Sequence, residues 1–187
     1  WALASRLWRA AGDLAATARC LEKAGNLREA GGVLEQAGDF AAAIERYRQF
    51  LFEAGEDEAP NEERAGVRLA LGRLLLRHGR PDEALPLLQR AWHDGVEPVP
   101  AQAGRAVAAG LHWLGYAHAA REAVALLQER SAPDAQPINL EEILADDTLA
   151  PVEEADGGGR VLAGRYQLGE LLGAGGMGSV YSAEDLL

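Results

Sequence analysis

The chain has 187 residues, 48% of them apolar and 25% charged, and this composition excludes a collagen-like fibre and a protein that is disordered throughout. Its net charge of −11 disfavours nucleic acid and anionic membranes as partners, because both are bound through Lys and Arg side chains that neutralise phosphate. Apolar runs also fall short of the roughly 18 residues that a membrane-spanning helix needs.

The first residue is Trp1 rather than Met, and no signal-peptide layout follows it. We therefore expect the chain to be a segment of a longer protein. The single cysteine, Cys20, lies among Ala and Leu in a helical pattern and is predicted to be buried rather than reactive. One cysteine cannot form an internal disulfide, which is consistent with a reducing compartment, so we expect a cytoplasmic protein.

A short sequence pattern occurs three times between residues 8 and 40, and each copy contains a glycine followed by Asp or Asn. The glycines are spaced thirteen residues apart, at Gly12, Gly25 and Gly38. Glycine takes the left-handed conformation that ends a helix, and the Asp or Asn after it accepts hydrogen bonds from the free amides of the next helix. Each copy therefore predicts a helix of about ten residues and a tight turn.

Helices this short are marginal alone, so we expect them to stack as a helical solenoid. Small residues and large apolar residues recur on the faces that such stacking would bury: Ala30, Val33, Leu34, Ala43, Ile44 and Tyr47. Longer helical units follow an acidic, proline-containing break at residues 56–61.

The segment 69–92 resembles a tetratricopeptide repeat, with a helix, a turn at Gly79, and a second helix that has a small residue where the two helices touch. A looser copy spans residues 103–127 and has His118 where the first copy has Gly79. Residues 1–130 are therefore predicted to form an all-α, tetratricopeptide-like solenoid. The resemblance implies a protein or peptide partner on its concave face.

Three tryptophans occupy apolar helical positions and are predicted to fill the core rather than form a ligand box: Trp8, Trp92 and Trp113. Large rings at such positions usually occupy the gap between neighbouring hairpins. No metal site is predicted, because the histidines lack the i, i+4 pairing of helical metal sites: His78, His93, His112 and His118. No residue of this chain is predicted to be catalytic.

The composition changes abruptly between residues 131 and 159, where three prolines and many acidic residues occur without any Lys or Arg. Uncompensated charge opposes collapse, so this stretch is predicted to be a tether that ends in a flexible joint at residues 157–159. Within it, residues 138–144 place apolar side chains at helical spacing after a helix-start signal. Two interpretations stay open: a short helix that docks on a groove, and a transient helix in a disordered linker.

The most specific pattern lies between residues 164 and 185. Gly173, Gly175 and Gly178 form G-x-G-x-x-G between two segments that favour β-strands. Dinucleotide-binding folds use the same glycine spacing, but there a helix begins within the glycines, and Ser179 and Val180 start a helix poorly. A P-loop would require Gly-Lys followed by Ser or Thr, which this stretch lacks. The predicted arrangement is therefore strand, glycine loop and strand.

This stretch is similar to the first two strands of bacterial serine/threonine protein kinases of the eukaryotic type, in which G-x-G-G-M-G-x-V-Y is frequent. The resemblance implies that the three motif glycines let backbone amides approach the phosphates of ATP, and that Val180 covers the adenine with Leu172 beside it. Met177 would lie at the tip of the loop without a contact of its own. The implied ATP-binding residues are Leu172, Gly173, Ala174, Gly175, Gly176, Met177, Gly178, Ser179 and Val180.

Residues 160–187 would thus be the truncated start of a kinase domain. The lysine of the third strand, the H-R-D loop and the D-F-G element, which act on ATP and Mg²⁺ in the complete kinase, would follow Leu187. We therefore expect this chain alone to be inactive and to bind no cofactor. Two strands bury little apolar surface, so we expect this segment to be disordered or to lean on the repeats.

Two functions are consistent with these patterns. The first is the interaction and regulatory region of a multidomain serine/threonine kinase, in which the repeats recruit or sense a protein partner and the acidic tether spaces the domains. The second is a non-catalytic helical-repeat scaffold that carries a degenerate or truncated kinase remnant. The coding sequence beyond Leu187 would distinguish between them.

Overall fold

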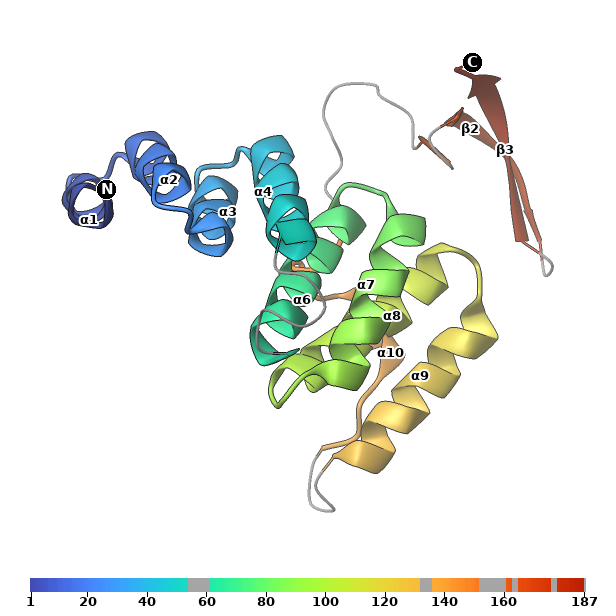
Figure 1. The fold of residues 1–187 in the computed structure, drawn as a ribbon. Coiled ribbons are helices and arrows are strands. Elements are labelled where there is room, and N and C mark those ends of the chain that lie inside the picture. Colours follow the sequence, from blue (N-terminus) through green and yellow to red (C-terminus); the bar gives the residue numbers. More distant parts are fainter. Residues whose placement is uncertain (54–60, 132–135, 152–160, 163–164, 176–177, 187) are drawn as a thin grey trace.

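The computed structural model describes residues 1–53, 61–131, 136–151, 161–162, 165–175 and 178–186. Figure 1 shows a row of helices followed by a small antiparallel sheet. The helices are α1 (Ala2–Ala10), α2 (Leu14–Lys23), α3 (Leu27–Gln36), α4 (Phe40–Glu53), α6 (Asn61–Arg77), α7 (Pro81–Asp94), α8 (Val99–Trp113), α9 (Ala117–Arg130) and α10 (Leu140–Leu144). The strands are β1 (Val161–Leu162), β2 (Tyr166–Gly175) and β3 (Gly178–Asp185).

The helices from α1 to α9 are stacked in chain order, and each packs mainly against the helix before it and the helix after it (Figure 1). In addition, α6 contacts α8, so alternate helices of the longer units also touch. Packing between neighbours in the chain is the arrangement that defines a solenoid, and it buries one face of each helix without any long-range pairing. The predicted helical solenoid is therefore present in the described residues.

The turns between the short helices have the predicted left-handed glycines. All three have a φ of +78°: Gly12, Gly25 and Gly38. The carboxylate of Asp13 accepts a hydrogen bond from the amide of Ala16 at 2.7 Å, and that of Asp39 accepts one from the amide of Ala42 at 3.1 Å. The side chain of Asn26 makes no such bond, so the capping prediction is confirmed at two of the three turns.

The turn of the last repeat differs from the prediction. Gly115 lies between α8 and α9 with a φ of +85°, as Gly79 lies between α6 and α7 with a φ of +65°. His118 is an exposed residue in the first turn of α9, and its imidazole lies 3.5 Å from the carboxylate of Glu122. The alignment of His118 with Gly79 is therefore wrong, because the position that ends the helix is already filled by a glycine three residues earlier.

The core runs along the row, and within it α6 contacts α4, α7 and α8. The largest side chains with almost no exposed surface include Leu71, Leu74, Leu75, Leu76 and Leu88. The residues predicted to face neighbouring helices are all buried, as is Cys20: Ala30, Val33, Leu34, Ala43, Ile44 and Tyr47. These predictions are confirmed. They could be made from the sequence because local spacing alone determines which side of a short helix is apolar.

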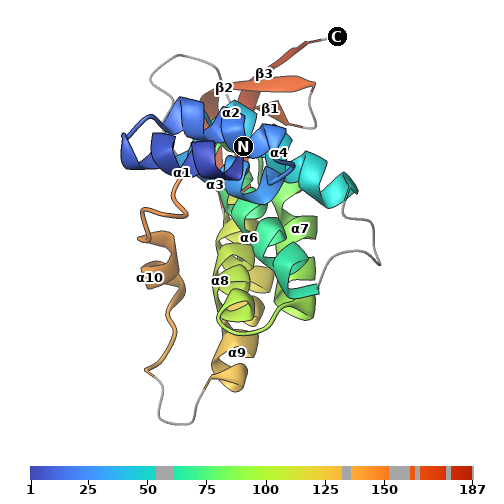
Figure 2. The ribbon, with the colours of Figure 1, turned by 60° about the vertical axis from the view of Figure 1, so that its left-hand side comes forward.

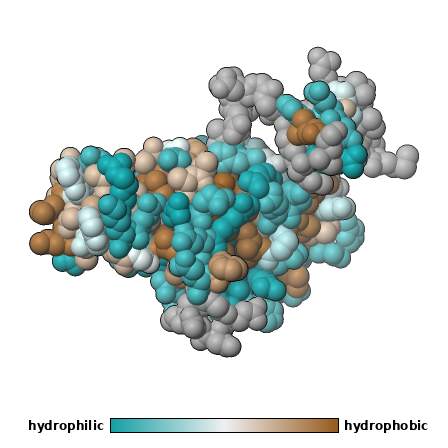
Figure 3. All heavy atoms as spheres, turned by 45° about the horizontal axis from the view of Figure 1, so that its top comes forward, coloured by the Kyte–Doolittle hydropathy of each residue, from teal (hydrophilic) through white to brown (hydrophobic). Residues whose placement is uncertain are grey.

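The prediction for the tryptophans is only partly correct. Trp92 and Trp113 are partly buried against the core, whereas 46% of Trp8 is exposed. Trp8 lies on α1, whose neighbour in the row is α2. Leu3 and Leu7 of α1 and Trp1, which precedes this helix, are exposed as well. Figure 3 shows apolar surface at this end of the row. An apolar position predicts burial only where a neighbouring helix covers it.

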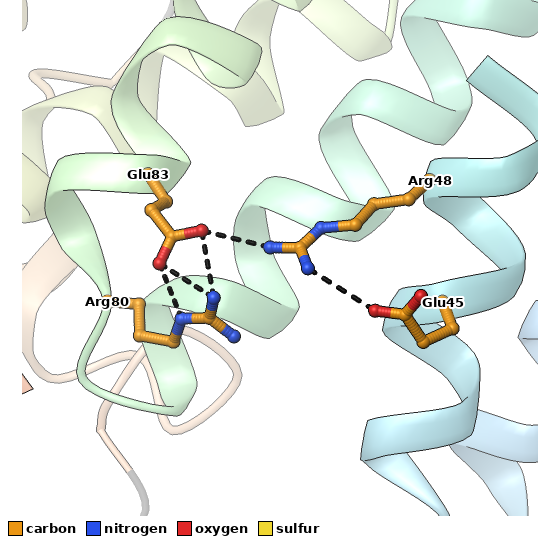
Figure 4. A network of polar contacts seen from close by, with 4 residues as sticks. All are labelled: Glu45, Arg48, Arg80 and Glu83. Atoms are coloured by element: carbon orange, nitrogen blue, oxygen red, sulfur yellow. Dashed lines mark hydrogen bonds and ion pairs between the residues drawn. The ribbon is translucent and has the colours of Figure 1, made fainter. Parts of the chain in front are cut away.

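Charged contacts connect α4 with the start of α7. Glu83 on α7 accepts hydrogen bonds from Arg80 at 2.7 and 2.8 Å and from Arg48 of α4 at 2.9 Å, as Figure 4 shows. Arg48 also lies 3.3 Å from Glu45 on its own helix. These side chains are about half exposed, so the network fixes orientation more than it adds stability.

A more deeply placed ion pair joins α6 to α7. The guanidinium of Arg68 lies 2.9 Å from the carboxylate of Asp94, and only 8% of the Arg68 side chain is exposed. Burial and the nearby Arg64 lower the pKa of Arg68. The hydrogen bond from His93 and the charge of Arg68 lower the pKa of Asp94. Because Arg68 is largely removed from water, loss of its carboxylate partner would lower the free energy of unfolding.

The C-terminal segment forms a three-stranded antiparallel sheet in the order β1-β2-β3. The two strands predicted on either side of the glycines are therefore present. The same residues had also been expected to be disordered or to contact the repeats.

None of the helices in the described part of the chain is long and apolar enough to cross a membrane.

Candidate functional site

The described glycines of the motif lie at the end of β2 and the start of β3. β2 ends at Gly175 and β3 begins at Gly178, and the Cα atoms of these two glycines are opposite each other. The other predicted nucleotide-binding residues follow on both strands, with Gly173 opposite Val180 and Ala174 opposite Ser179. Leu172 lies on β2 as well. The remaining predicted residues, Gly176 and Met177, lie outside the described residues.

The chain after the glycines is extended. β3 continues from Gly178 to Asp185, so a strand is present where a dinucleotide-binding fold would begin a helix. The pairing of β2 with β3 also shifts between Leu168 and Gly173, which marks an irregularity in β2 just before the motif. Glycines at a hairpin turn leave the backbone amides open to a close approach by phosphate oxygens.

Two charged side chains close the open end of this hairpin. The guanidinium of Arg165 donates to both carboxylate oxygens of Asp185, at 2.8 and 2.6 Å. The amide of Leu186 donates to the carbonyl of Arg165 at 2.7 Å. Paired hydrogen bonds from Arg to a carboxylate have a defined geometry, so they hold the ends of β2 and β3 in register.

A second candidate site involves the acidic segment after α9. Residues 138–149, which we call the strap, lie against the repeats, and Figure 2 shows their helix α10 beside α8. Ile143 of α10 has no exposed surface and Leu149 has 3%. α10 contacts α8 and, to a lesser extent, α9. Of the two interpretations that the sequence left open, the docked helix is therefore the one that the structure has.

Polar contacts hold both ends of the strap. At its start, the amide of Ile138 donates to the side-chain oxygen of Gln128 on α9 at 2.7 Å. The side chain of Asn139 then accepts from the amide of Glu141 at 3.0 Å and caps α10. Because these bonds satisfy the first free amides of the segment, the strap follows one path over the helices.

At its end, the strap turns at Asp146. The carboxylate of Asp146 accepts hydrogen bonds from the hydroxyl and the amide of Thr148, at 2.7 and 2.9 Å. These bonds, together with the positive charges of Arg73 on α6 and Arg105 on α8, lower the pKa of Asp146. Leu149 follows in the same turn, with its amide bonded to the carbonyl of Asp146 at 2.9 Å. The strap thus places a carboxylate beside two helices that carry arginines.

A hollow of about 560 Å³ opens elsewhere on the repeats, between the start of α4 and the turn from α6 to α7. Phe40 and His78 form part of its wall, with their ring centroids 5.0 Å apart. Arg48 and Arg80 of the charged network in Figure 4 also line it. Among the described residues, no group of three or more His, Cys, Asp or Glu side chains is placed to hold a metal ion.

Sequence reasoning did not identify the residues that receive the strap. Arg73, Arg105 and Gln128 are spread over three helices, and only the fold brings them near one acidic segment. One signal was present, because residues 131–159 contain many acidic residues and no Lys or Arg. A segment of that kind can dock only where the surface supplies compensating positive charge.

Comparison with known proteins supports the assignment of the repeats. Residues 34–109, which run from the end of α3 into α8, match the family model described as tetratricopeptide repeat. A search of curated proteins found no match to the chain. Together with the helical architecture, the family match confirms tetratricopeptide-like helical repeats, and such repeats generally bind other proteins.

Proposed function

We propose that this chain is the interaction and regulatory region of a multidomain serine/threonine protein kinase, which transfers the γ-phosphate of ATP to Ser or Thr of proteins. In this proposal the repeats bind a protein or peptide partner in the cytoplasm, and the hairpin opens the ATP-binding lobe. The observation that carries the proposal is the run G-x-G-G-M-G-x-V-Y, with its glycines at the turn of an antiparallel hairpin.

Kinases lay a glycine-rich hairpin over the phosphates of ATP, because backbone amides there can donate to phosphate oxygens without interference from side chains. In this chain, Gly173, Gly175 and Gly178 would supply those amides. Leu172 and Val180, on the two strands, would flank the adenine. In the complete protein, the lysine that follows the second strand in this family would hold the phosphates of ATP, the D-F-G aspartate would hold Mg²⁺, and the H-R-D aspartate would accept the proton of the substrate hydroxyl.

The coding sequence beyond Leu187 provides the first test. The proposal requires V-A-x-K within about 20 residues of Val180, followed by H-R-D and D-F-G. Their absence would leave a helical-repeat scaffold with a kinase remnant, which is the second candidate.

Titration with ATP of the full-length protein and of the present chain tests whether the nucleotide site is complete only in the full-length protein. We expect the full-length protein to bind ATP with Mg²⁺, and the present chain to show no appreciable affinity. In the full-length protein, Gly173→Val combined with Gly175→Val is expected to weaken ATP binding at least about tenfold, because the added side chains block the approach of phosphate. Gly158→Val, in the tether, is the matched control and should leave the affinity unchanged. Equal affinities of the two variants would count against the proposed role of the glycines.

A further inference from the structure

We propose that the strap is a built-in ligand of the repeats, and that the surface beneath it binds a partner peptide of the same chemistry. That chemistry is an aliphatic residue, an acidic residue three positions later and a second aliphatic residue three positions after that, as in Ile143, Asp146 and Leu149. The strap and the partner would exclude each other. This inference rests on the proposed role of the repeats in binding a partner, and it names the site and the kind of ligand.

Two aliphatic residues anchor the strap by their burial in the core of the repeats. Ile143 and Leu149 belong to the hydrophobic core even though they lie in an acidic, proline-containing segment. Three further aliphatic residues of the strap are partly buried against the core, namely Ile138, Leu140 and Leu144, whereas Glu141 and Glu142 are exposed. A segment that inserts aliphatic side chains and keeps its acidic side chains in water is bound in the way that short peptides bind to grooves.

The strap carries acidic residues and no Lys or Arg. Its docked turn at Asp146, held by Thr148, experiences the positive charges of Arg73 of α6 and Arg105 of α8. The strap runs from Gln128 of α9 past α8 to reach them. These positive charges favour an acidic ligand over a basic one at this position.

The strap is also built to exchange. α10 has five residues, too few to be helical without the surface beneath it. α8 and α9 pack against each other, and α8 packs against α7, so these helices have their own partners without the strap. A competing peptide that supplies the same two anchors and the same carboxylate can therefore replace the strap without dismantling the repeats.

Replacement of the strap would change the connection between the repeats and the hairpin. With the strap docked, the connection begins at Pro151, and with the strap displaced it begins at Ser131. The connection to β1, which begins at Val161, would therefore be longer by about twenty residues after displacement. Binding of a partner would thereby be transmitted to the segment that carries the glycine motif.

The test uses an otherwise wild-type chain with a protease site inserted between Ser131 and Gln136, cut after folding so that the strap is no longer covalently attached to the repeats. The probe is a labelled synthetic peptide of residues 136–151. We expect the peptide to displace the cut C-terminal piece, and to bind the cut chain at least about tenfold more tightly than the uncut chain, in which the strap competes at high effective concentration.

Three controls make the result specific. A peptide with Ile143→Asp and Leu149→Asp should bind at least about tenfold more weakly, and a scrambled peptide should not bind. A peptide with Asp146→Lys should also lose affinity, and it should regain affinity on a chain with Arg73→Glu and Arg105→Glu. The helical circular dichroism of the repeats should persist after displacement.

Failure of a 100-fold excess of peptide to release the cut piece would overturn the inference, and so would release accompanied by loss of helical signal. Either result would make the strap a permanent cap of the repeats. Neither result bears on ATP binding by the full-length protein, which separates failure of this inference from failure of the proposed kinase.

Discussion

Two adjacent glycines in the middle of α3 allow a sharp test of how the short helices stack. A Cβ atom added at Gly31 would lie 2.5 Å from Cε1 and 2.7 Å from Cδ1 of Tyr47 on α4. A Cβ atom added at Gly32 would come no closer than 3.7 Å to any atom, again of Tyr47. Substitution by Ala thus gives the same change in helix propensity at both sites and a steric conflict at only one of them.

The conflict at Gly31 has no easy relief. Only 4% of Tyr47 is exposed, and its hydroxyl donates to the carboxylate of Glu35 at 3.1 Å, so the ring cannot move away without breaking this partly buried hydrogen bond. Overpacking of this kind costs about 1–3 kcal/mol. Ala in place of Gly within a helix contributes about 0.5–1 kcal/mol in the opposite direction. We therefore expect Gly32→Ala to stabilise the protein by about 0.5–1 kcal/mol and Gly31→Ala to be about 1–3 kcal/mol less stable than Gly32→Ala.

Urea denaturation followed by circular dichroism at 222 nm, with both variants measured beside the parent chain, gives this difference from the shift in midpoint at constant slope. The reasoning would be refuted by variants of equal stability, within about 0.5 kcal/mol. Such a result would mean that α3 and α4 are not packed as closely as the structure has them.

The turn glycine and the deep ion pair give two more predictions. Gly115→Ala should destabilise the chain by about 1–2 kcal/mol, because Gly115 has a φ of +85° and the added Cβ would meet no atom within 4 Å, so that backbone strain alone acts. Asp94→Asn should cost about 1–2 kcal/mol in the free energy of unfolding at pH 7, because Arg68 then loses its carboxylate partner. The hydrogen bond from His93 and the charge of Arg68 lower the pKa of Asp94, so its contribution is present above about pH 4 and is lost as the pH falls through the lowered value. Thermal melts from pH 7 to pH 2.5 should therefore show the gap between the parent chain and Asp94→Asn closing on the acid side.

Each of these two variants has a control on the same protein. Gly66→Ala, in α6, also places a Cβ where no atom lies within 4 Å, but its backbone is helical, so it should stabilise rather than destabilise. Glu129→Gln removes an exposed carboxylate near the end of α9 and should change stability by less than about 0.5 kcal/mol. If Gly115→Ala changed the free energy of unfolding as Gly66→Ala does, backbone strain at Gly115 would be refuted. If the difference in stability between the parent chain and Asp94→Asn did not depend on pH, the role of the Asp94 carboxylate would be refuted.

What could be predicted from the sequence was set by local chemistry. The thirteen-residue glycine spacing predicted the short helices because a left-handed residue and a capping side chain act within one turn of backbone. The hairpin around Gly175 and Gly178 could be predicted for the same reason, since alternating β-favouring residues and glycines determine strand and turn locally.

What could not be predicted depended on which surfaces meet. Trp8 has the spacing of a core residue, but no described helix covers its side of α1. His118 was aligned by residue count along an imperfect repeat, and the count missed Gly115, which ends α8. The docking of Ile143 required a surface built from distant helices, so apolar spacing alone left two interpretations equal.

The central claim is that a partner-binding helical solenoid is joined here to the opening of an ATP-dependent kinase. Its most direct test is to incubate the full-length protein with Mg²⁺ and γ-labelled ATP and to follow the label into protein Ser and Thr. We predict transfer by the parent protein, and loss of transfer when Gly173 and Gly175 are both changed to Val. A protein that transfers no label, and whose sequence after Leu187 lacks the lysine, H-R-D and D-F-G elements, would contradict the claim.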